Sequence, residues 1–312
     1  MPRSLTRSDL EQMFAQVKNW GRWGADDERG ALNFITPAKR AEAAAGIQDG
    51  SVVSCALDFP VEPGPDNPHP ALHMMNSAGD ICTGAGPDAF QSTTDFIGIS
   101  FHGLASSHID ALCHVLVDEQ MYNGFHASEV KSTGAVRGSI MAARDGIASR
   151  GVLLDIPRSR GTDWLEPGDP ISIEDLEAAE KHHAVRVEEG DVLLVATGRH
   201  ARRAAKGDWN AMSEGLAGLH PECVPWLHER RIAVLGSDGI SDVVPGPGIQ
   251  GWFVPIHQCG IVGIGLHLLD NLDLSALSRA CAERERYAFF FVVAPLRVEG
   301  GTGSPVNPIA IF

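Results

Sequence analysis

Histidine and aspartate residues cluster in one short segment of this sequence. Residues 101–115, FHGLASSHIDALCHV, contain His102, His108, Asp110 and His114. Side chains two residues apart on an extended strand point to the same side, so His108 and Asp110 can hold one ion, and His114 shares their parity. Imidazole nitrogen with carboxylate oxygen suits Zn²⁺, with Mn²⁺ and Fe²⁺ as competitors, and the absence of Cys pairs disfavours a closed structural zinc site. The segment therefore predicts an open metal site suited to hydrolysis.

His102 can join this site only if the chain bends. Six extended residues span roughly 20 Å, which is too far for His102 and His108 to share an ion. Gly103 and the small residues after it permit the required turn. The alternative is that these are unrelated polar residues of a half-buried strand, but such residues are seldom buried without partners.

The segment SHIDALCH resembles the metal-dependent cyclase family, which includes bacterial kynurenine formamidase and isatin hydrolase. The family's usual mark is His-x-Gly-Thr-His-x-Asp-x-Pro-x-His. Its first His falls on Leu104 here, and we expect His102 to take that place through a two-residue insertion. The resemblance implies that His108 and Asp110 are metal ligands, with Asp110 able to bridge two ions, and that His114 transfers a proton.

Other parts of the chain are similar to the longer bacterial members of this family. The similar stretches are residues 23–37, 150–158, 190–198 and 235–245. In the family a late His and a following acidic residue complete the metal site, which implies His257 and Asp270 here. His267 is an alternative ligand, and it is about as well explained as a satisfied buried histidine.

Length and charge limit the class of protein. A chain of 312 residues is long enough for a substantial core, and we expect one domain over residues 1–312, because the predicted ligands lie in both halves. The formal net charge of −15 disfavours nucleic-acid binding, because phosphate backbones would repel the chain. No long apolar run and no basic-then-apolar leader is visible, so we expect no membrane span and a cytoplasmic location.

The six cysteines are dispersed without a C-x-x-C pair, which indicates reduced thiols rather than a disulfide framework. Cys113 adjoins His114 and raises the alternative of a metal-independent Cys/His nucleophile. Neighbouring residues of a strand point to opposite faces, which disfavours that alternative.

The elements that must position these residues indicate an α/β fold with a mixed sheet and flanking helices. Ser8 with Glu11 predicts a capping box for a helix that runs to Trp20, and Thr36-Pro37 predicts the start of another that ends near Gly46. Further helices are predicted over residues 172–182, 221–230 and 275–286, and strands over 52–57, 96–101, 152–156, 192–196, 232–235 and 288–293. The family resemblance implies a swivelling β/β/α-type domain.

A long loop and several aromatic residues are candidates for the substrate pocket. Residues 60–87 show no period and predict a loop before the metal motif, with a solvent-facing insertion as the alternative. Trp20, Trp23 and Phe34, together with Trp252 and Phe253, could form an apolar wall for an aromatic substrate, although core packing would also explain them.

The function predicted from these observations is a metal-dependent hydrolase that cleaves an amide, a formamide or a lactam. One or two ions, Zn²⁺ or Mn²⁺, would lower the pKa of water from about 16 towards about 7 and polarise the carbonyl. His114 would accept the proton of the water and return it to the leaving group. The alternatives are a lactone hydrolase or ring-forming cyclase that uses the same site, and a non-catalytic metal or small-molecule binding protein. We expect a small-molecule substrate and, since the family often forms dimers, a homo-oligomer.

Overall fold

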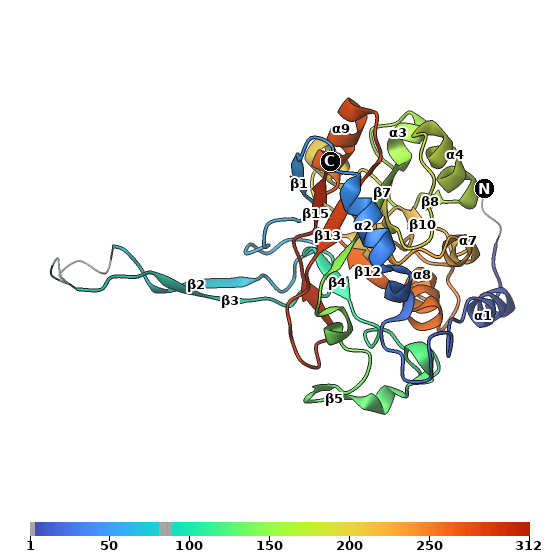
Figure 1. Cartoon of the computed structure of the whole chain (residues 1–312), viewed down its shortest axis with the longest axis horizontal. Coiled ribbons are helices and arrows are strands. Elements are labelled where there is room, and N and C mark those ends of the chain that lie inside the picture. Colours follow the sequence, from blue (N-terminus) through green and yellow to red (C-terminus); the bar gives the residue numbers. More distant parts are fainter. Residues whose placement is uncertain (1–3, 81–85, 87–88) are drawn as a thin grey trace.

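A mixed β-sheet organises the chain in the computed structural model, which describes residues 4–80, 86 and 89–312 (Figure 1). The nine strands in spatial order are β1 (Val52–Ser54), β15 (Ile309–Ile311), β13 (Ala288–Val293), β7 (Ile147–Asp155), β9 (Val192–Ala196), β11 (Val234–Ser237), β12 (His267–Asp270), β4 (His108–Asp110) and β14 (Gly303–Pro305). Strands β7, β9, β11 and β12 are parallel neighbours. The outer strands pair antiparallel, so the sheet joins segments from both ends of the sequence.

The sheet separates two hydrophobic cores because successive side chains alternate between its faces. Val152 and Leu154 of β7 belong to one core, whereas Leu153 between them belongs to the other. In β12, Leu268 and Leu269 divide in the same way. The predicted mixed α/β fold with flanking helices is confirmed.

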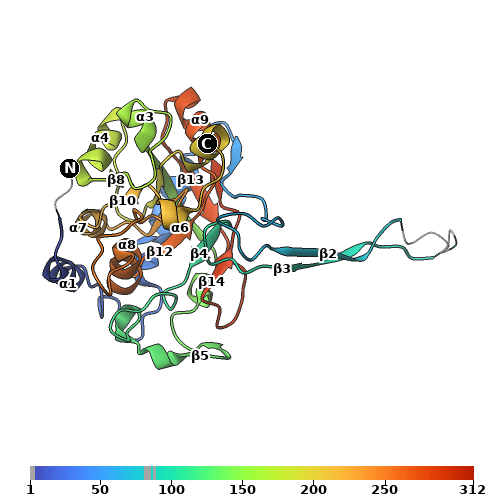
Figure 2. The ribbon, with the colours of Figure 1, turned by 180° about the vertical axis from the view of Figure 1, so that it is seen from behind.

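Helices cover both faces of the sheet (Figures 1 and 2). The α-helices are α1 (Arg7–Gln16), α2 (Pro37–Ala45), α3 (Ile156–Arg160), α4 (Ile173–His182), α5 (Arg199–Lys206), α6 (Ala211–Glu214), α7 (Cys223–Glu229), α8 (Pro255–His257) and α9 (Ser275–Arg284). The 3₁₀ turns are η1 (Gly30–Phe34), η2 (Tyr122–Gly124), η3 (Ala127–Glu129) and η4 (Ile140–Ala143), and a π-helix, η5 (Gln258–Ile264), continues α8. Buried residues of α1, α4, α7 and η5 pack in the first core, those of η4 and α9 pack in the second, and those of η1 are divided between the two.

Local signals set some element boundaries correctly. Thr36 caps α2 through its side chain, with Pro37 in the first turn, and strands β9 and β13 have the predicted bounds. The predicted start of α1 was wrong, because its capping box is formed by Thr6 and Asp9 rather than by Ser8 and Glu11. This helix also ends at Gln16, before Trp20.

The predicted loop before the metal motif was wrong over part of its length. β2 (Leu72–Ser77) pairs antiparallel with β3 (Thr94–Gly98), and together they form a ribbon that projects from the rest of the molecule (Figures 1 and 2). The rest of the predicted loop includes residues 81–85 and 87, which lie outside the described residues. The strand predicted over 96–101 corresponds to β3 and ends three residues earlier than expected.

Two further strand pairs are short: β5 (Val130–Lys131) with β6 (Gly134–Ala135), and β8 (Pro170–Ile171) with β10 (Gly218–Leu219).

In the part of the chain that the structure describes, none of the helices has the length and apolar character needed to cross a membrane.

Candidate metal centre

Strand pairing brings the predicted early and late ligands together. β4 is a three-residue strand, His-Ile-Asp, between β12 and β14. In the register of β4 and β12, Asp270 lies directly opposite His108 although 162 residues separate them in the sequence. Ile109 packs into the second core, so His108 and Asp110 face the other side, as their two-residue spacing predicted.

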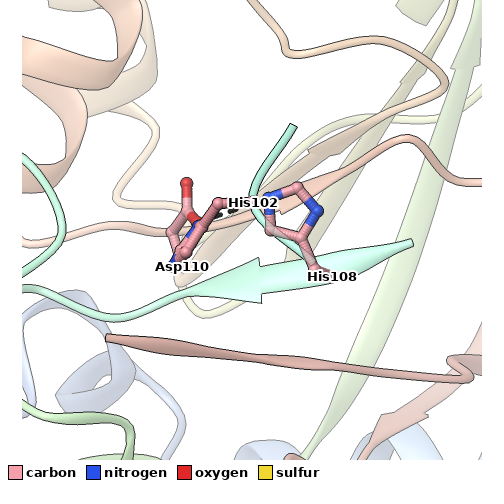
Figure 3. Close-up of side chains that lie close together, drawn as sticks. All are labelled: His102, His108 and Asp110. Carbon is pink, nitrogen blue, oxygen red and sulfur yellow. Dashed lines mark ion pairs between the residues drawn. The ribbon is translucent and has the colours of Figure 1, made fainter. Parts of the chain in front are cut away.

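His102 reaches the same place because the chain folds back between it and β4. Its Nδ1 lies 3.1 Å from Oδ1 of Asp110, and Nε2 of His108 lies 3.5 Å from that same oxygen (Figure 3). Ser106 fixes the ring of His108, because its carbonyl oxygen accepts a hydrogen bond from Nδ1 at 2.8 Å. Nε2 of His108 is therefore left to face the carboxylate.

His257 approaches Asp110 from the other side and is oriented by Asp242. Nδ1 of His257 donates to Oδ2 of Asp242 at 2.6 Å. Nε2 then lies 3.2 Å from Oδ2 of Asp270 and 3.6 Å from Oδ2 of Asp110. A carboxylate that binds the far nitrogen of an imidazole fixes its tautomer, which is how histidines that bind metals are commonly held.

Asp242 was missed as a functional residue. It lies in the stretch 235–245 that resembles the family, and it is buried with only 1 % of its surface exposed. Its oxygens also accept the backbone N–H groups of Ile256 and His257, at 2.7 and 3.1 Å. The available signal was an aspartate in a segment that resembles the cyclase family, but its partner His257 could not be derived from the sequence.

The donor atoms fit a divalent ion. Ligand atoms of His102, His108 and Asp110 lie within 4.8 Å of one another, and those of Asp110, His257 and Asp270 do so as well. Both oxygens of Asp110, Nδ1 of His102 and Oδ1 of Asp270 are buried without a hydrogen bond. Buried polar atoms normally have partners, and an ion would supply one. Because Asp110 belongs to both groups, the arrangement fits either one ion or two ions that share its carboxylate.

The pKa values of the metal-free site reflect the same contacts. Burial raises the pKa of the Asp110 carboxyl, but the contact with His102 and the charges of the other imidazoles lower it well below its usual value. Burial lowers the pKa of His257, but the carboxylates of Asp270 and Asp242 raise it well above the usual value for histidine.

His114 lies beside the ligand groups without belonging to either. The chain turns after β4, with N–H of His114 donating to the carbonyl of Ala111 at 3.0 Å, so His114 is not on the strand. Its ring stacks on that of His102 at 3.8 Å, and its Nε2 lies 3.9 Å from Oδ1 of Asp110. Burial lowers the pKa of His114, and the neighbouring imidazoles lower it further against the opposing effect of Asp110. At neutral pH the ring is therefore neutral and able to accept a proton.

A cavity of about 560 Å³ opens onto these side chains. Its polar floor consists of His102, His108, Asp110, His114, His257 and Asp270. Its apolar walls include Leu104, Val115, Met212, Ile240, Phe253 and Val254. A largely apolar cavity with a few convergent polar groups is the usual form of a small-molecule site.

Most of the aromatic residues predicted to contact substrate lie outside the cavity wall. Trp23 and Phe34 pack edge to face at 5.0 Å, and Trp252 packs in the same way on Phe14 at 5.9 Å. These three residues and Trp20 pack in or against the first core, so core packing, the alternative explanation, describes their position. Phe253, which was also predicted as a wall residue, lines the cavity.

The structure also places the two alternative site residues away from the cavity. His267 and Asp270 are three residues apart on β12, so they point to opposite faces of the sheet. Both ring nitrogens of His267 lack a hydrogen bond.

Cys113 is buried in the second core, and burial raises its pKa to about 12. A thiol that stays protonated at neutral pH is a poor nucleophile. Four other cysteines, Cys55, Cys223, Cys259 and Cys281, are likewise buried and free, and Cys82 lies outside the described residues.

Comparisons with known proteins agree with this fold. The family described as "Putative cyclase" matches residues 57–242. A crystal structure of a novel cyclase shares 31% identity with a TM-score of 0.86, over 96% of this chain and 99% of that chain. Isatin hydrolase A from Labrenzia aggregata, bound to benzyl benzoate, shares 22% identity with a TM-score of 0.60, over 87% of this chain and 96% of its own. A predicted metal-dependent hydrolase from Bacillus stearothermophilus shares 16% identity with a TM-score of 0.51, over 84% and 98% of the two chains. A comparison with curated proteins finds no match.

Fold and site together define an α/β protein with a candidate metal centre at the base of a small-molecule cavity. The family match covers more than half of the residues, and the 31% identity to the cyclase structure extends over nearly the whole chain. The chain belongs to the cyclase family, and its structural neighbours include hydrolases.

Proposed function

We propose that this protein is a single-domain, metal-dependent hydrolase that cleaves an amide, a formamide or a cyclic amide. The observation that carries the proposal is the buried carboxylate of Asp110, shared by two groups of potential ligands at the floor of an apolar cavity. A divalent ion, Zn²⁺ or Mn²⁺, would polarise a carbonyl oxygen and lower the pKa of a water molecule.

The protein side chains would divide the remaining work. His102, His108, Asp110, His257 and Asp270 would hold one or two ions, and Asp242 would keep Nε2 of His257 turned towards them. His114, neutral and at the cavity surface, would accept a proton from water and return it to the leaving nitrogen. The apolar walls would hold the ring of the substrate away from water and so orient its carbonyl towards the floor.

A lactone hydrolase or a ring-forming cyclase could use the same floor, because both reactions also polarise a carbonyl and move a proton. A non-catalytic binding protein is a weaker candidate, because it has no need of His114 beside the ligands. Isatin hydrolase A, a structural neighbour with an aromatic ligand, supports a small aromatic or cyclic substrate.

The proposal is tested with metal-free protein, prepared by chelation and then reloaded with Zn²⁺ or Mn²⁺. The substrates are N-formyl aromatic amines, isatin-like lactams and unsaturated lactones. We expect hydrolysis of at least one amide to disappear on chelation and to return on reloading. Full activity in metal-free protein would contradict the metal mechanism, and hydrolysis of lactones alone would favour the second candidate.

Phe253 offers a test of the cavity walls. Its side chain lines the cavity and is 58 % exposed, so a ring in the cavity can cover it. We expect Phe253→Ala to raise KM for an aromatic substrate by about tenfold, since one apolar contact is worth roughly 1–3 kcal/mol, with metal content unchanged. Phe59→Ala is the matched control, because it removes a half-exposed ring outside the described cavity wall. Equal KM values for the two variants would place the substrate elsewhere.

We also propose that the protein is a homo-oligomer that assembles through the β2–β3 ribbon. Leu72, Met74 and Phe96 share one face of the ribbon, because Met74 pairs with Phe96 and Leu72 is two residues away. They are 57 %, 52 % and 47 % exposed. An isolated two-stranded ribbon is only marginally stable in water, and a contiguous apolar face is a common mark of an interface. A second copy would cover this face.

Light scattering of the purified protein tests this assembly. We expect the wild type to be a dimer or larger, and Met74→Lys with Phe96→Lys to shift it to monomer, because two charges would then lie on the covered face. His73→Ala, on the opposite face of the ribbon, is the control. A monomeric wild type at micromolar concentration would contradict the proposal.

A further inference from the structure

Arg199 is a buried cation that lies behind the candidate metal centre. It is the first residue of α5, just after β9, and its side chain is 2 % exposed. A buried guanidinium is costly unless charged and polar partners surround it. Arg199 belongs neither to the cavity wall nor to either group of potential ligands, as the described residues define them. The function proposed above therefore gives it no role.

The guanidinium of Arg199 joins four separate segments. Nη2 donates to Oδ2 of Asp66 at 2.8 Å and to the carbonyl of Leu104 at 2.9 Å. Nη1 donates to Oδ1 of Asn271 at 2.7 Å and to the carbonyl of Asp238 at 3.3 Å. Asp66 and Leu104 both line the cavity. The planar fork of arginine suits such divergent contacts better than the point charge of lysine.

Asn271 extends these contacts to the ligands. It directly follows Asp270, and its Nδ2 donates to the carbonyl of Gly103 at 2.8 Å and to that of Ser106 at 3.3 Å. The Ser106 carbonyl is the group that accepts from Nδ1 of His108. A continuous set of hydrogen bonds therefore runs from Arg199 through Asn271 to the ring of His108.

The backbone of Asn271 strengthens the same connection. Its φ of 53° is left-handed, a conformation that Asn and Gly adopt more readily than other residues. Its carbonyl accepts from the hydroxyl of Ser107 at 2.6 Å. The turn that carries His102 and the segment that carries Asp270 are thus fastened to each other, and Arg199 holds both.

We propose that Arg199 is a positioning residue that sets the affinity of the centre for metal, by fixing the 102–107 turn against Asp270 through Asn271. This inference rests on the proposed function, because it assigns Arg199 to the same centre. It adds a residue that touches neither ion nor substrate.

The test compares Arg199→Met with Arg230→Met by chelator competition for Zn²⁺ and by thermal melting of the metal-free proteins. Arg230 is a matched control, because it is also largely buried and pairs with a carboxylate, Glu180, at 2.7 Å, but contacts none of the described site residues. We expect both variants to melt at lower temperature than the wild type. Only Arg199→Met should bind Zn²⁺ more weakly, by about 10- to 100-fold, as is usual when a partner behind a ligand is lost. The Zn²⁺ affinity of Arg199→Lys should fall between those of the wild type and Arg199→Met.

Asn271→Gly provides a second route if Arg199→Met does not fold. Glycine keeps the left-handed backbone and removes the amide that contacts Gly103 and Ser106. We expect it to weaken Zn²⁺ binding, and Arg199→Lys to add little on top of it, because two residues of one network are not additive. Zn²⁺ affinity within twofold of the wild type in Arg199→Met or Asn271→Gly, or an equal loss in Arg230→Met, would overturn the inference. A wild type that binds no ion would overturn the proposed function, and the positioning role with it.

Discussion

Replacing Asp110 with asparagine should abolish metal binding and hydrolysis together. Asp110 is the one residue common to both groups of potential ligands among the described residues, and the substitution keeps its shape while removing its charge. Loss of a partner behind a ligand typically lowers metal affinity by 10- to 100-fold, so loss of the shared ligand itself should cost at least about 100-fold. Chelator competition and elemental analysis measure the occupancy, and the substrate screen measures the activity.

The stability of the metal-free variant distinguishes a lost ligand from a damaged fold. Both oxygens of Asp110 are buried without hydrogen bonds, so its charge is compensated only by nearby imidazoles. The neighbouring imidazoles hold the pKa of Asp110 well below its usual value, so its charge favours the folded state, and Asp110→Asn should lower the melting temperature of the metal-free protein moderately. We expect the metal-free variant still to melt in one cooperative transition, as an intact fold does. His126→Asn, which replaces an exposed histidine outside the described cavity wall, should keep both metal and activity. Retained occupancy and activity in Asp110→Asn would show that the ligand assignment is wrong.

Local spacing predicted the centre of the site and several elements. His108 and Asp110 could be paired from sequence because alternation along a strand depends only on neighbouring residues. The bounds of α2, β9 and β13 were equally local, since a Thr-Pro start and continuous apolar runs mark them.

Contacts between distant segments could not be derived in this way. Asp270 meets His108 through the register of β4 and β12, which spacing along the chain does not encode. Family resemblance, rather than spacing, indicated His257 and Asp270. Asp242 and Arg199 show the limit of both approaches, because their roles depend on hydrogen bonds to residues 15 and 72 positions away.

The cavity wall was predicted only in part and the ribbon was missed, for different reasons. Trp252 and Phe253 are neighbours of similar character, and one packs in the core while the other lines the cavity. Composition alone cannot decide between them. β2 was not predicted because residues Leu72 to Met75 are all exposed, on both faces of a free ribbon. No alternation of apolar and polar residues therefore marks this strand in the sequence.

Replacing His114 with alanine should separate catalysis from metal binding. The ring of His114 lies at the cavity surface, outside both groups of potential ligands, and its neutral state suits a general base. We expect the variant to keep its metal and its fold but to lose roughly two to four orders of magnitude in kcat, the usual contribution of positioned proton transfer. The measurements are kcat, zinc content and the far-ultraviolet circular dichroism spectrum of the same preparation.

His102→Ala is the informative comparison, because the two rings stack on each other but only His102 offers a ligand atom to the centre. That variant should lose metal affinity and activity in parallel, whereas His114→Ala should lose activity alone. If His114→Ala also loses its metal, His114 is itself a ligand and another group must move the proton. If its kcat is unchanged with metal retained, His114 is a stacked neighbour of His102, and the proton-transfer step proposed for it is wrong.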